Sequence, residues 1–435
     1  MARWCSRRTF LSYLVVGVVV LSGCDWSMTR FGPAQTGYDA FETTIGVNNV
    51  ANVHAAWSAP IPVGEPHGLV VANGVLFVGT DSSVAPLYAF DAKGSSGCSG
   101  PPQTCAPLWT STVNIAGTAE VAAGRVYVPA GQTLYAFDAA GVNGCRGVPK
   151  TCAPLWSYSD AGATFAQPVI VNGLVFAGTS AGELVVFDAA GSTGCSGTPE
   201  VCVPLWIGQT GGAGSTSSPA VVGGVAYVSA SGAATAGYLF AFDASGATGC
   251  SGTPKTCAPL WQAQGQFGTP TVSRGYVYVG SGSTQTSVFD ASGATNCAGV
   301  PKICTALWTD PAGATFSYLA VANGVMYANA GGTLEAFDAF GHTNCSGTPT
   351  TCKPLWTAAG PFANSPIVAN GVVYVSSGST ATTAAFDAAG ISGCSGTPKS
   401  CTPLAAFSVT GFPSPIIDNG VIYGSSGRTI EALKL

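Results

Sequence analysis

The chain has 435 residues, of which 47% are hydrophobic and 8% are charged, with 59 glycines and a formal net charge of −5. Disordered chains are charged and poor in apolar residues, so this composition excludes disorder as the general state of the chain. No basic excess or basic run is present to neutralise phosphates, so we expect no nucleic-acid partner.

The N-terminus is interpreted as an export signal over residues 1–23. Residues 6–11 (Ser-Arg-Arg-Thr-Phe-Leu) match the twin-arginine export pattern, and the apolar run that follows is too short for a membrane span. Residues 21–24 (Leu-Ser-Gly-Cys) resemble the bacterial lipobox, in which the cysteine is lipidated. The alternative is an ordinary cleaved signal with a chance cysteine. We expect lipidation at Cys24 and a tether and lead-in segment over 24–52.

A repeated unit follows, and each copy is expected to form four short strands. In the copy over residues 169–206 these strands are 169–171, 174–178, 183–187 and 204–206. An Asn-Gly pair, a strong signal for a two-residue hairpin, joins the first two strands. The hairpin position recurs eight times, at residues 73–74, 123–124, 172–173, 223–224, 274–275, 323–324, 370–371 and 419–420.

Eight small sheets cannot each hide two faces alone, but radial stacking buries each face against its neighbour. The sequence therefore predicts an all-β fold, an eight-bladed β-propeller of four-stranded antiparallel blades over residues 53–435. A linear solenoid is the alternative, and it would need capping repeats with polar outer faces, which the sequence lacks.

The ends of the repeat array predict how the ring closes. The last copy has three strands, near Ile416, Val421 and Ile430, and no fourth. An isolated strand at 53–57, which contains Trp57, precedes the first copy. We expect this N-terminal strand to complete the last blade, which would pin the two ends of the chain together.

A cysteine pair with six residues between its members recurs seven times, and successive copies start 47 to 55 residues apart. Such pairs are typical of disulfides in an oxidising compartment. Zinc is the alternative, although structural zinc sites favour cysteines two to four residues apart, often with histidine, and the chain has three histidines. The predicted disulfides are Cys98–Cys105, Cys145–Cys152, Cys195–Cys202, Cys250–Cys257, Cys297–Cys304, Cys345–Cys352 and Cys394–Cys401.

An aspartate ends the third strand of seven copies and is followed three residues later by glycine in each of them. This pattern is typical of a turn in which the carboxylate accepts backbone N–H groups. One aspartate per blade cannot converge on a single ion, so we expect no metal site. The aspartates are Asp91, Asp138, Asp188, Asp243, Asp290, Asp338 and Asp387.

The sequence Ala-Phe-Asp-Ala-x-Gly, followed later by Leu-Trp, resembles the tryptophan-docking repeat of the pyrroloquinoline-quinone (PQQ)-like propeller family. Residues 30–38, 43–44 and 49–50 also resemble the segment that precedes the propeller in that family. The resemblance covers residues 26–435, but the glycine spacing and the inserted cysteine loop depart from the pattern. It implies that tryptophans pack between adjacent blades and are structural, namely Trp57, Trp109, Trp156, Trp206, Trp261, Trp308 and Trp356. Ala405 replaces tryptophan in one copy.

The same resemblance leaves two functional classes open, because the family includes quinoprotein dehydrogenases, outer-membrane assembly scaffolds and lipoproteins. The dehydrogenases hold the quinone with calcium, a catalytic aspartate and a stacking tryptophan, and often have a disulfide between adjacent cysteines. Here no two cysteines are adjacent. His54, His67 and His342 lie far apart in the sequence, and no pair of acidic residues has a spacing that indicates acid–base chemistry.

The sequence therefore favours a monomeric, exported, non-catalytic scaffold or binding module. We expect it to be lipid-anchored on the outer face of the cytoplasmic membrane or in a periplasm, with an envelope protein or cell-surface component as its partner. No catalytic residue, metal or cofactor is predicted. The alternative is a PQQ- and calcium-dependent quinoprotein dehydrogenase.

Two loop features have open interpretations. Phenylalanines that precede the first strand either pack between blades or form an apolar rim around a central funnel; they are Phe165, Phe267, Phe316, Phe362 and Phe412. Basic residues in the cysteine loops either face an anionic surface or form a solvated edge; they are Arg146, Lys150, Lys255, Lys302, Lys353 and Lys399.

Overall fold

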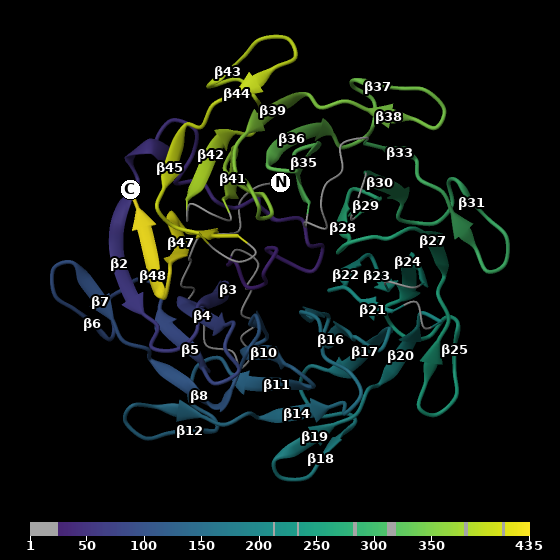
Figure 1. Ribbon diagram of the computed structural model, residues 1–435. Coiled ribbons are helices and arrows are strands. Elements are labelled where there is room, and N and C mark those ends of the chain that lie inside the picture. Colours follow the sequence, from purple (N-terminus) through teal and green to yellow (C-terminus); the bar gives the residue numbers. More distant parts are fainter. Residues whose placement is uncertain are drawn as a thin grey trace, which may run out of the picture.

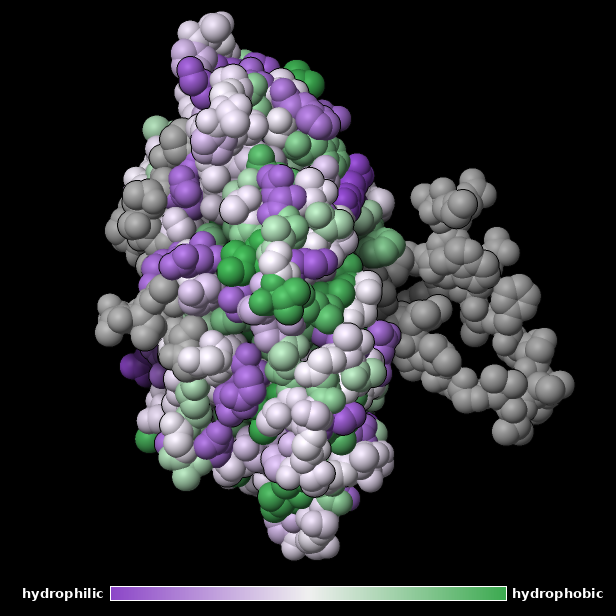
Figure 2. All heavy atoms as spheres, turned by 90° about the vertical axis from the view of Figure 1, so that its right-hand side faces the viewer, coloured by the Kyte–Doolittle hydropathy of each residue, from purple (hydrophilic) through white to green (hydrophobic). Residues whose placement is uncertain are grey.

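The strands of the computed structural model form eight hydrogen-bonded sheets arranged radially around a centre (Figure 1). The structure describes residues 25–211, 214–232, 235–281, 285–310, 319–377, 382–410 and 414–435. Seen from the side, the ring is a thick disc whose rim carries hydrophilic and hydrophobic residues side by side (Figure 2). Within the described ranges, no helix is long and apolar enough to span a membrane.

Each sheet contains four antiparallel strands in succession from the centre outward. They follow chain order in seven sheets, whereas in the last sheet β2 follows β48. The innermost strands are β3 (Pro66–Ala72), β9 (Glu120–Ala122), β15 (Val169–Val171), β22 (Ala220–Val222), β28 (Thr271–Ser273), β34 (Ala320–Ala322), β40 (Ile367–Ala369) and β46 (Ile416–Asp418). The second strands are β4 (Val75–Thr80), β10 (Arg125–Ala130), β16 (Leu174–Gly178), β23 (Val225–Gly232), β29 (Tyr276–Gly280), β35 (Val325–Ala330), β41 (Val372–Ser376) and β47 (Val421–Ser426).

The two outer positions follow the same order. The third strands are β5 (Pro86–Asp91), β11 (Thr133–Asp138), β17 (Glu183–Asp188), β24 (Thr235–Asp243), β30 (Thr286–Asp290), β36 (Thr333–Asp338), β42 (Thr383–Asp387) and β48 (Thr429–Lys434). The fourth strands are β8 (Trp109–Asn114), β14 (Trp156–Ser159), β20 (Trp206–Gln209), β27 (Trp261–Gln264), β33 (Trp308–Thr309), β39 (Trp356–Ala359), β45 (Ala405–Phe407) and β2 (His54–Pro60).

Each cysteine loop forms a two-stranded hairpin that leaves its own blade. Its second strand pairs in parallel with the fourth strand of the preceding blade, as in the pair β7–β2. The hairpins are β6 (Cys98–Ser99) with β7 (Gln103–Cys105), β12 (Cys145–Arg146) with β13 (Thr151–Cys152), β18 (Cys195–Ser196) with β19 (Glu200–Cys202), β25 (Cys250–Ser251) with β26 (Thr256–Cys257), β31 (Cys297–Ala298) with β32 (Ile303–Cys304), β37 (Cys345–Ser346) with β38 (Thr351–Cys352), and β43 (Cys394–Ser395) with β44 (Ser400–Cys401).

The predicted eight-bladed propeller of four-stranded antiparallel blades is therefore wrong in the composition of its blades. The sheets contain five to seven strands. In seven sheets, a hairpin from the next repeat pairs in parallel with the fourth strand and forms the outer edge. The remaining sheet has no such hairpin among the described residues and gains β1 (Tyr38–Asp39) at its inner edge instead. The sequence pattern shows which strands form but not that an insertion pairs with a neighbouring sheet, because that pairing depends on the distance between blades.

The chain ends close the ring. Strand β2 pairs antiparallel with β48, from His54 opposite Lys434 to Pro60 opposite Thr429, as the strand count of the last repeat predicts. The same sheet also receives the first hairpin, because β7 pairs with the other edge of β2. The N-terminal strand is thus held on both edges, which opposes fraying.

All seven predicted cysteine pairs form disulfides. The paired cysteines face each other directly across the hairpin, as Cys250 faces Cys257. The disulfide therefore fixes the base of a hairpin whose second strand covers the edge of another sheet.

Removing one disulfide should lower the free energy of unfolding. In the double variant Cys250→Ser, Cys257→Ser we expect a loss of about 2.5 kcal/mol, because the closed loop restricts the unfolded chain. Urea unfolding of the oxidised variant and of the wild type measures this loss. The reduced wild-type protein is the control, and an unchanged urea midpoint of the oxidised variant would contradict the prediction.

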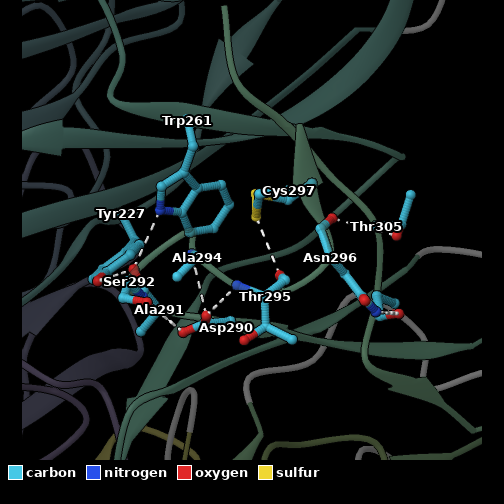
Figure 3. The surroundings of a disulfide bond; sticks show 12 residues. Tyr227, Trp261, Asp290, Ala291, Ser292, Ala294, Thr295, Asn296, Cys297 and Thr305 are labelled. Carbon is cyan, nitrogen blue, oxygen red and sulfur yellow. Dashed lines mark hydrogen bonds between the residues drawn. A yellow bond between two sulfur atoms is a disulfide. The ribbon is translucent and has the colours of Figure 1, made fainter. Parts of the chain in front are cut away.

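The tryptophans of the fourth strands lie between blades, each against the aspartate turn of the next blade. All seven are at most 3% exposed. In Figure 3, Trp261 Nε1 donates to the carbonyl of Ala291 over 3.2 Å, and Tyr227 Oη donates to the same carbonyl over 2.9 Å. A Cβ atom on Gly293 would lie 2.3 Å from the Trp261 ring, so this turn needs glycine for the close approach as well as for its φ of +63°.

The aspartate turns are built as expected from the sequence. The Asp290 carboxylate accepts backbone N–H groups from Ser292, Ala294 and Thr295 (Figure 3). Although burial opposes it, this bonding lowers the pKa of Asp290 to about 2. The aspartates therefore stabilise turns, and the described residues contain no group of acidic, histidine or cysteine side chains that could hold a metal ion.

One junction between blades differs from the rest. Ala405 takes the tryptophan position in β45, and its neighbour is the 3-10 helix η1 (Val50–Asn52) instead of an aspartate turn. Within the described part of the chain the buried hydroxyl of Tyr374 has no hydrogen-bond partner, whereas the equivalent Tyr327 Oη donates to the carbonyl of Ala388 over 2.9 Å. The lead-in segment thus replaces tryptophan docking at this junction.

Candidate functional site

Residues 25–39 run across one end of the central channel and bind the inner strands. Their backbone carbonyls accept N–H groups from the same position of six inner strands. These bonds are Val71 to Trp26 (2.9 Å), Val121 to Ser27 (2.8 Å), Val221 to Pro33 (2.8 Å), Val272 to Ala34 (2.9 Å), Val321 to Thr36 (3.0 Å) and Val368 to Gly37 (2.8 Å). The segment therefore satisfies inner strand edges that would otherwise stay unpaired, and it obstructs the channel at this end.

The path of this N-terminal segment depends on local backbone geometry. Gly37 has a φ of +60°, and a Cβ atom there would lie 2.2 Å from the Arg30 guanidinium. The Arg30 side chain is fully buried, and its Nη2 donates to the carbonyl of Leu319 over 2.9 Å. Beyond Gly37, β1 pairs in parallel with β40. From the sequence, a tether outside the propeller is expected here, whereas residues 25–39 bind the inner strands of the propeller.

Buried carboxyl groups hold the N-terminal segment to the blades. The Glu120 carboxyl group receives the backbone N–H of Thr29 over 2.8 Å and also its hydroxyl group. Burial raises the pKa of Glu120 to about 8, against the lowering effect of these hydrogen bonds. Glu120 is therefore largely protonated at neutral pH, and it acts as a hydrogen-bonding anchor inside the channel.

A second set of carboxyl groups lies where the segment meets the last blade. Asp418 Oδ1 accepts the Trp26 N–H over 3.1 Å, and Glu42 Oε2 accepts the Gly420 N–H over 2.8 Å. Burial raises the pKa of Asp418 to about 6 and that of Asp39 to about 7. The sequence does not indicate these anchors, because the partners of Glu120, Glu42 and Asp418 are 91, 378 and 392 residues away.

The other end of the channel opens into a funnel of about 380 Å³. The polar members of its described lining include Thr118, Gln167, Ser218 and Thr269, which occupy equivalent positions in successive blades. Each lies three residues before an inner-strand valine or isoleucine at the level of the N-terminal segment, a rise of about 10 Å along a strand. The funnel and the N-terminal segment therefore lie at opposite ends of the inner strands.

These residues continue around the channel as a polar ring, which consists of Thr118, Gln167, Ser218, Thr269, Ser365 and Ser414. Neighbouring members interact directly: Gln167 Nε2 donates to Thr118 Oγ1 over 2.9 Å, and Ser414 Oγ donates to the carbonyl of Ser365 over 2.5 Å. The ring was missed from the sequence. A signal was present, since each member lies at the same distance before a repeated hairpin, but hydroxyl-bearing residues are common in loops.

The described lining of the funnel is neutral. It contains no lysine, arginine, aspartate or glutamate, and its one titratable side chain is His67. Burial lowers the pKa of His67, against the raising effect of Asp81, so the imidazole is neutral at pH 7. Such a lining can donate and accept hydrogen bonds but offers no charge for pairing.

The phenylalanines that precede the first strands have different environments. Phe267 and Phe362 pack edge-on against Phe289 and Phe386, so they belong to the blade cores. Phe165 is half-buried, contacts Tyr158 and lines the funnel. Both interpretations from the sequence thus apply, each to different members, while Phe316 and Phe412 lie outside the described residues.

The other expected site residues are not brought together. His54 is exposed on β2, and His342 lies against the Phe340 ring. Three of the hairpin lysines, Lys150, Lys255 and Lys399, donate through Nζ to glycine carbonyls of the adjoining turns, at 3.0–3.1 Å. Three of the six basic residues of the cysteine loops thus stabilise turns. The predicted signal and the lipidation site Cys24 lie outside the described residues.

Comparison with known proteins places this architecture in a family. The model described as outer membrane protein assembly factor BamB matches residues 55–195 and 101–344, which together cover more than half of the chain. The chain belongs to the BamB family. No curated protein matches its sequence significantly.

Solved structures show the same fold in proteins of different activity. BamB from Moraxella catarrhalis has a TM-score of 0.57 at 14% identity, over 88% of this chain and 98% of that one. The quinohemoprotein alcohol dehydrogenase from Comamonas testosteroni has a TM-score of 0.63 at 14% identity, over 96% and 81%. The computationally designed protein Ika8 has a TM-score of 0.60 at 12% identity, over 88% and 99%. At these identities the likeness concerns the fold alone.

The fold shared with a dehydrogenase raises the question of whether the funnel fits PQQ. This quinone carries three carboxylates, which need cationic partners, and a calcium ion beside it needs carboxylate ligands. The described funnel lining offers neither, and the seven repeat tryptophans are buried between blades. The described residues of this BamB-family chain therefore do not fit that cofactor.

Proposed function

We propose that this protein is an exported, membrane-tethered scaffold that binds an envelope protein or cell-surface component through its propeller. The observation that carries the proposal is a channel obstructed at one end by the N-terminal segment and open at the other into a funnel whose described lining is neutral and hydrogen-bonding. Such a site suits binding of an uncharged polar group rather than acid–base or redox chemistry. Membership of the BamB family and the disulfide set support export to an oxidising compartment.

The proposed tether fits the position of the first described residues. Asp25 Oδ2 accepts the backbone N–H of Asn73, which lies in the turn at the end of β3 remote from the funnel. A lipid on Cys24 would therefore attach at the end of the channel opposite the funnel. The funnel would then face away from the membrane, where a partner has access to it.

A funnel-filling variant tests the binding role. We expect crosslinking in native membranes to capture a partner with the wild-type protein. The amount of captured partner should fall at least tenfold with Ser218→Trp, because the indole occupies the funnel. Ser157→Trp on the outer strand β14 is the matched control and should capture the partner normally. Equal capture by all three proteins would contradict the role of the funnel.

Two further readouts test the other parts of the proposal. Cys24→Ser should move the protein from the membrane to the soluble fraction, since the acyl chains would be lost.

The purified wild-type protein, mixed with PQQ and calcium, should show no dye-linked alcohol oxidation. Such oxidation would overturn the scaffold proposal in favour of a quinoprotein dehydrogenase.

A further inference from the structure

In most blades, the backbone of the outermost blade strand is hydrogen-bonded to a disulfide hairpin of the next repeat. In five blades, the backbone N–H of the second residue in the fourth strand donates to a hairpin carbonyl just before the second hairpin strand. These bonds are Thr110 to Lys150 (3.1 Å), Ile207 to Lys255 (2.9 Å), Gln262 to Lys302 (3.0 Å), Thr309 to Thr350 (3.0 Å) and Thr357 to Lys399 (3.0 Å). Strands β2 and β14 have the same parallel pairing, through Ser58 and Ser157.

Strand β45 has the same geometry but not the hairpin. Ala406 faces Ala384 across the sheet, as Thr357 faces Glu335 in the preceding blade, so its N–H points outward like that of Thr357. Among the described residues, β45 is the one fourth strand that pairs with no hairpin strand. Ala406 is exposed, whereas Thr357 is half-buried beneath its hairpin.

The lead-in segment covers part of this junction without completing the ladder. Helix η1 packs beside β45. Its Val50 is buried in a hydrophobic core, and the partly buried Ala405 packs against the same core. A 3-10 turn bonds within itself, as Asn52 N–H does to the carbonyl of Asn49, and offers no extended partner strand. The edge at Ala406 therefore stays available for pairing.

We propose that the outer edge of β45 is a docking site for a short extended segment of a partner protein, which pairs in parallel with Ala405–Phe407. This proposal rests on the proposed scaffold function and names one site through which the partner is held. The seven internal hairpins show what such an edge accepts: a strand of two or three residues that approaches in parallel.

The chemistry of the edge favours an uncharged segment with small or β-branched side chains. Strand β45 consists of two alanines and a phenylalanine and carries no charge that would select a charged partner. The internal strands that occupy the equivalent edges include Thr151–Cys152, Thr256–Cys257 and Thr351–Cys352. Binding of this kind gains its free energy mainly from backbone hydrogen bonds.

A peptide with the chemistry of the internal hairpins tests the site directly. The probe is the disulfide-closed octapeptide with the sequence of residues 345–352, which has no charged side chain. We expect weak, saturable 1:1 binding to the full-length protein by NMR titration, with shifts at β45. Ala406→Pro should weaken it at least tenfold, because proline removes the N–H, while Ala406→Val, which keeps the N–H, should retain the affinity.

The proline variant is expected to fold, because proline is tolerated on a sheet edge whose N–H faces solvent. Thr357→Pro is the matched control and should lower the thermal midpoint, since that N–H bonds to its hairpin. Absence of saturable peptide binding, or binding that Ala406→Pro leaves unchanged, would overturn the proposal. A wild-type dimer that Ala406→Pro converts to a monomer would also overturn it, because the occupant would then be a second copy.

Photo-crosslinking in native membranes separates this site from the general scaffold function. With p-benzoylphenylalanine at position 406 we expect a discrete adduct that is absent with the same group at position 357. If the partner is captured through the funnel but position 406 gives no adduct, the edge proposal fails and the scaffold function stands. If no variant captures a partner while the octapeptide binds β45, the scaffold function fails and the edge remains a binding site.

Discussion

Replacing Trp261 with alanine is expected to lower the free energy of unfolding by about 3–5 kcal/mol. The side chain is 2% exposed, packs on the Asp290 turn of the next blade and donates to the carbonyl of Ala291. Its removal leaves a cavity between two blades and takes away one of the two hydrogen bonds that the Ala291 carbonyl accepts, and both effects lower the stability. Urea unfolding, followed by far-UV circular dichroism, measures the loss.

The matched control uses the junction that has no tryptophan. Ala405→Trp should not stabilise the protein, because Ala405 faces η1 and no aspartate turn is present to receive an indole. Trp261→Phe should lose less than Trp261→Ala, since the ring fills part of the space. If Trp261→Ala changes stability by less than 1 kcal/mol, the tryptophans do not hold the blades together.

The stability of the protein should be greatest near pH 5 and should fall as the pH rises to 8. Burial raises the pKa of Glu120 to about 8, so the folded state binds more protons than the unfolded state above pH 4.5. The stabilisation from this group is therefore complete below pH 4.5 and is lost as the pH rises through 8, by about 3 kcal/mol between pH 5 and 8. Asp39 and Asp418, whose pKa values burial raises to about 7 and 6, change stability in the same direction.

The aspartate turns set the acid side of this profile. The pKa of Asp91, which burial raises but hydrogen bonds from Ser95 and backbone N–H groups lower further, is about 2. Such groups stabilise the fold above the unfolded pKa of about 4, and this contribution is lost as the pH falls towards 2. The two sets of carboxyl groups thus act in separate pH windows.

The variant Glu120→Gln isolates the buried group. Its amide keeps an acceptor for the Thr29 N–H and a donor for the Thr29 hydroxyl, but it does not ionise. We expect it to match the wild type at pH 5 and to be more stable than the wild type at pH 8, as urea midpoints at the two values would show. A wild-type midpoint that is independent of pH between 5 and 8 would contradict the argument.

The repeated features of this protein were predictable from the sequence because they are local. Asn-Gly pairs require φ values that few other residues adopt, as at Asn172 and Gly173, and therefore indicate hairpins. A cysteine pair with six residues between its members reaches across one hairpin, so the seven disulfides depended on no distant contact. The pairing of β2 with β48 followed from counting strands in the last repeat.

The features that decide function were not local. The N-terminal segment looked like a tether, yet its carbonyls bind inner strands from six blades, over separations as large as 331 residues between Gly37 and Val368. The hairpins looked like insertions within a blade, yet β26 and the other second strands seal the neighbouring sheet. Neither arrangement has a sequence signature, because backbone groups make both sets of bonds and any residue can supply them.

The sequence by itself determined the repeated unit, its turns, its disulfides and the strand exchange that closes the ring, since each depends on residue types at fixed short spacing. Only the tertiary structure decided that residues 25–39 obstruct the channel, that four members of the polar ring line the opposite funnel, and that β45 alone among the described fourth strands lacks a hairpin. These features arise where blades contact one another, and the distance and orientation of adjacent blades depend on the closed ring as a whole.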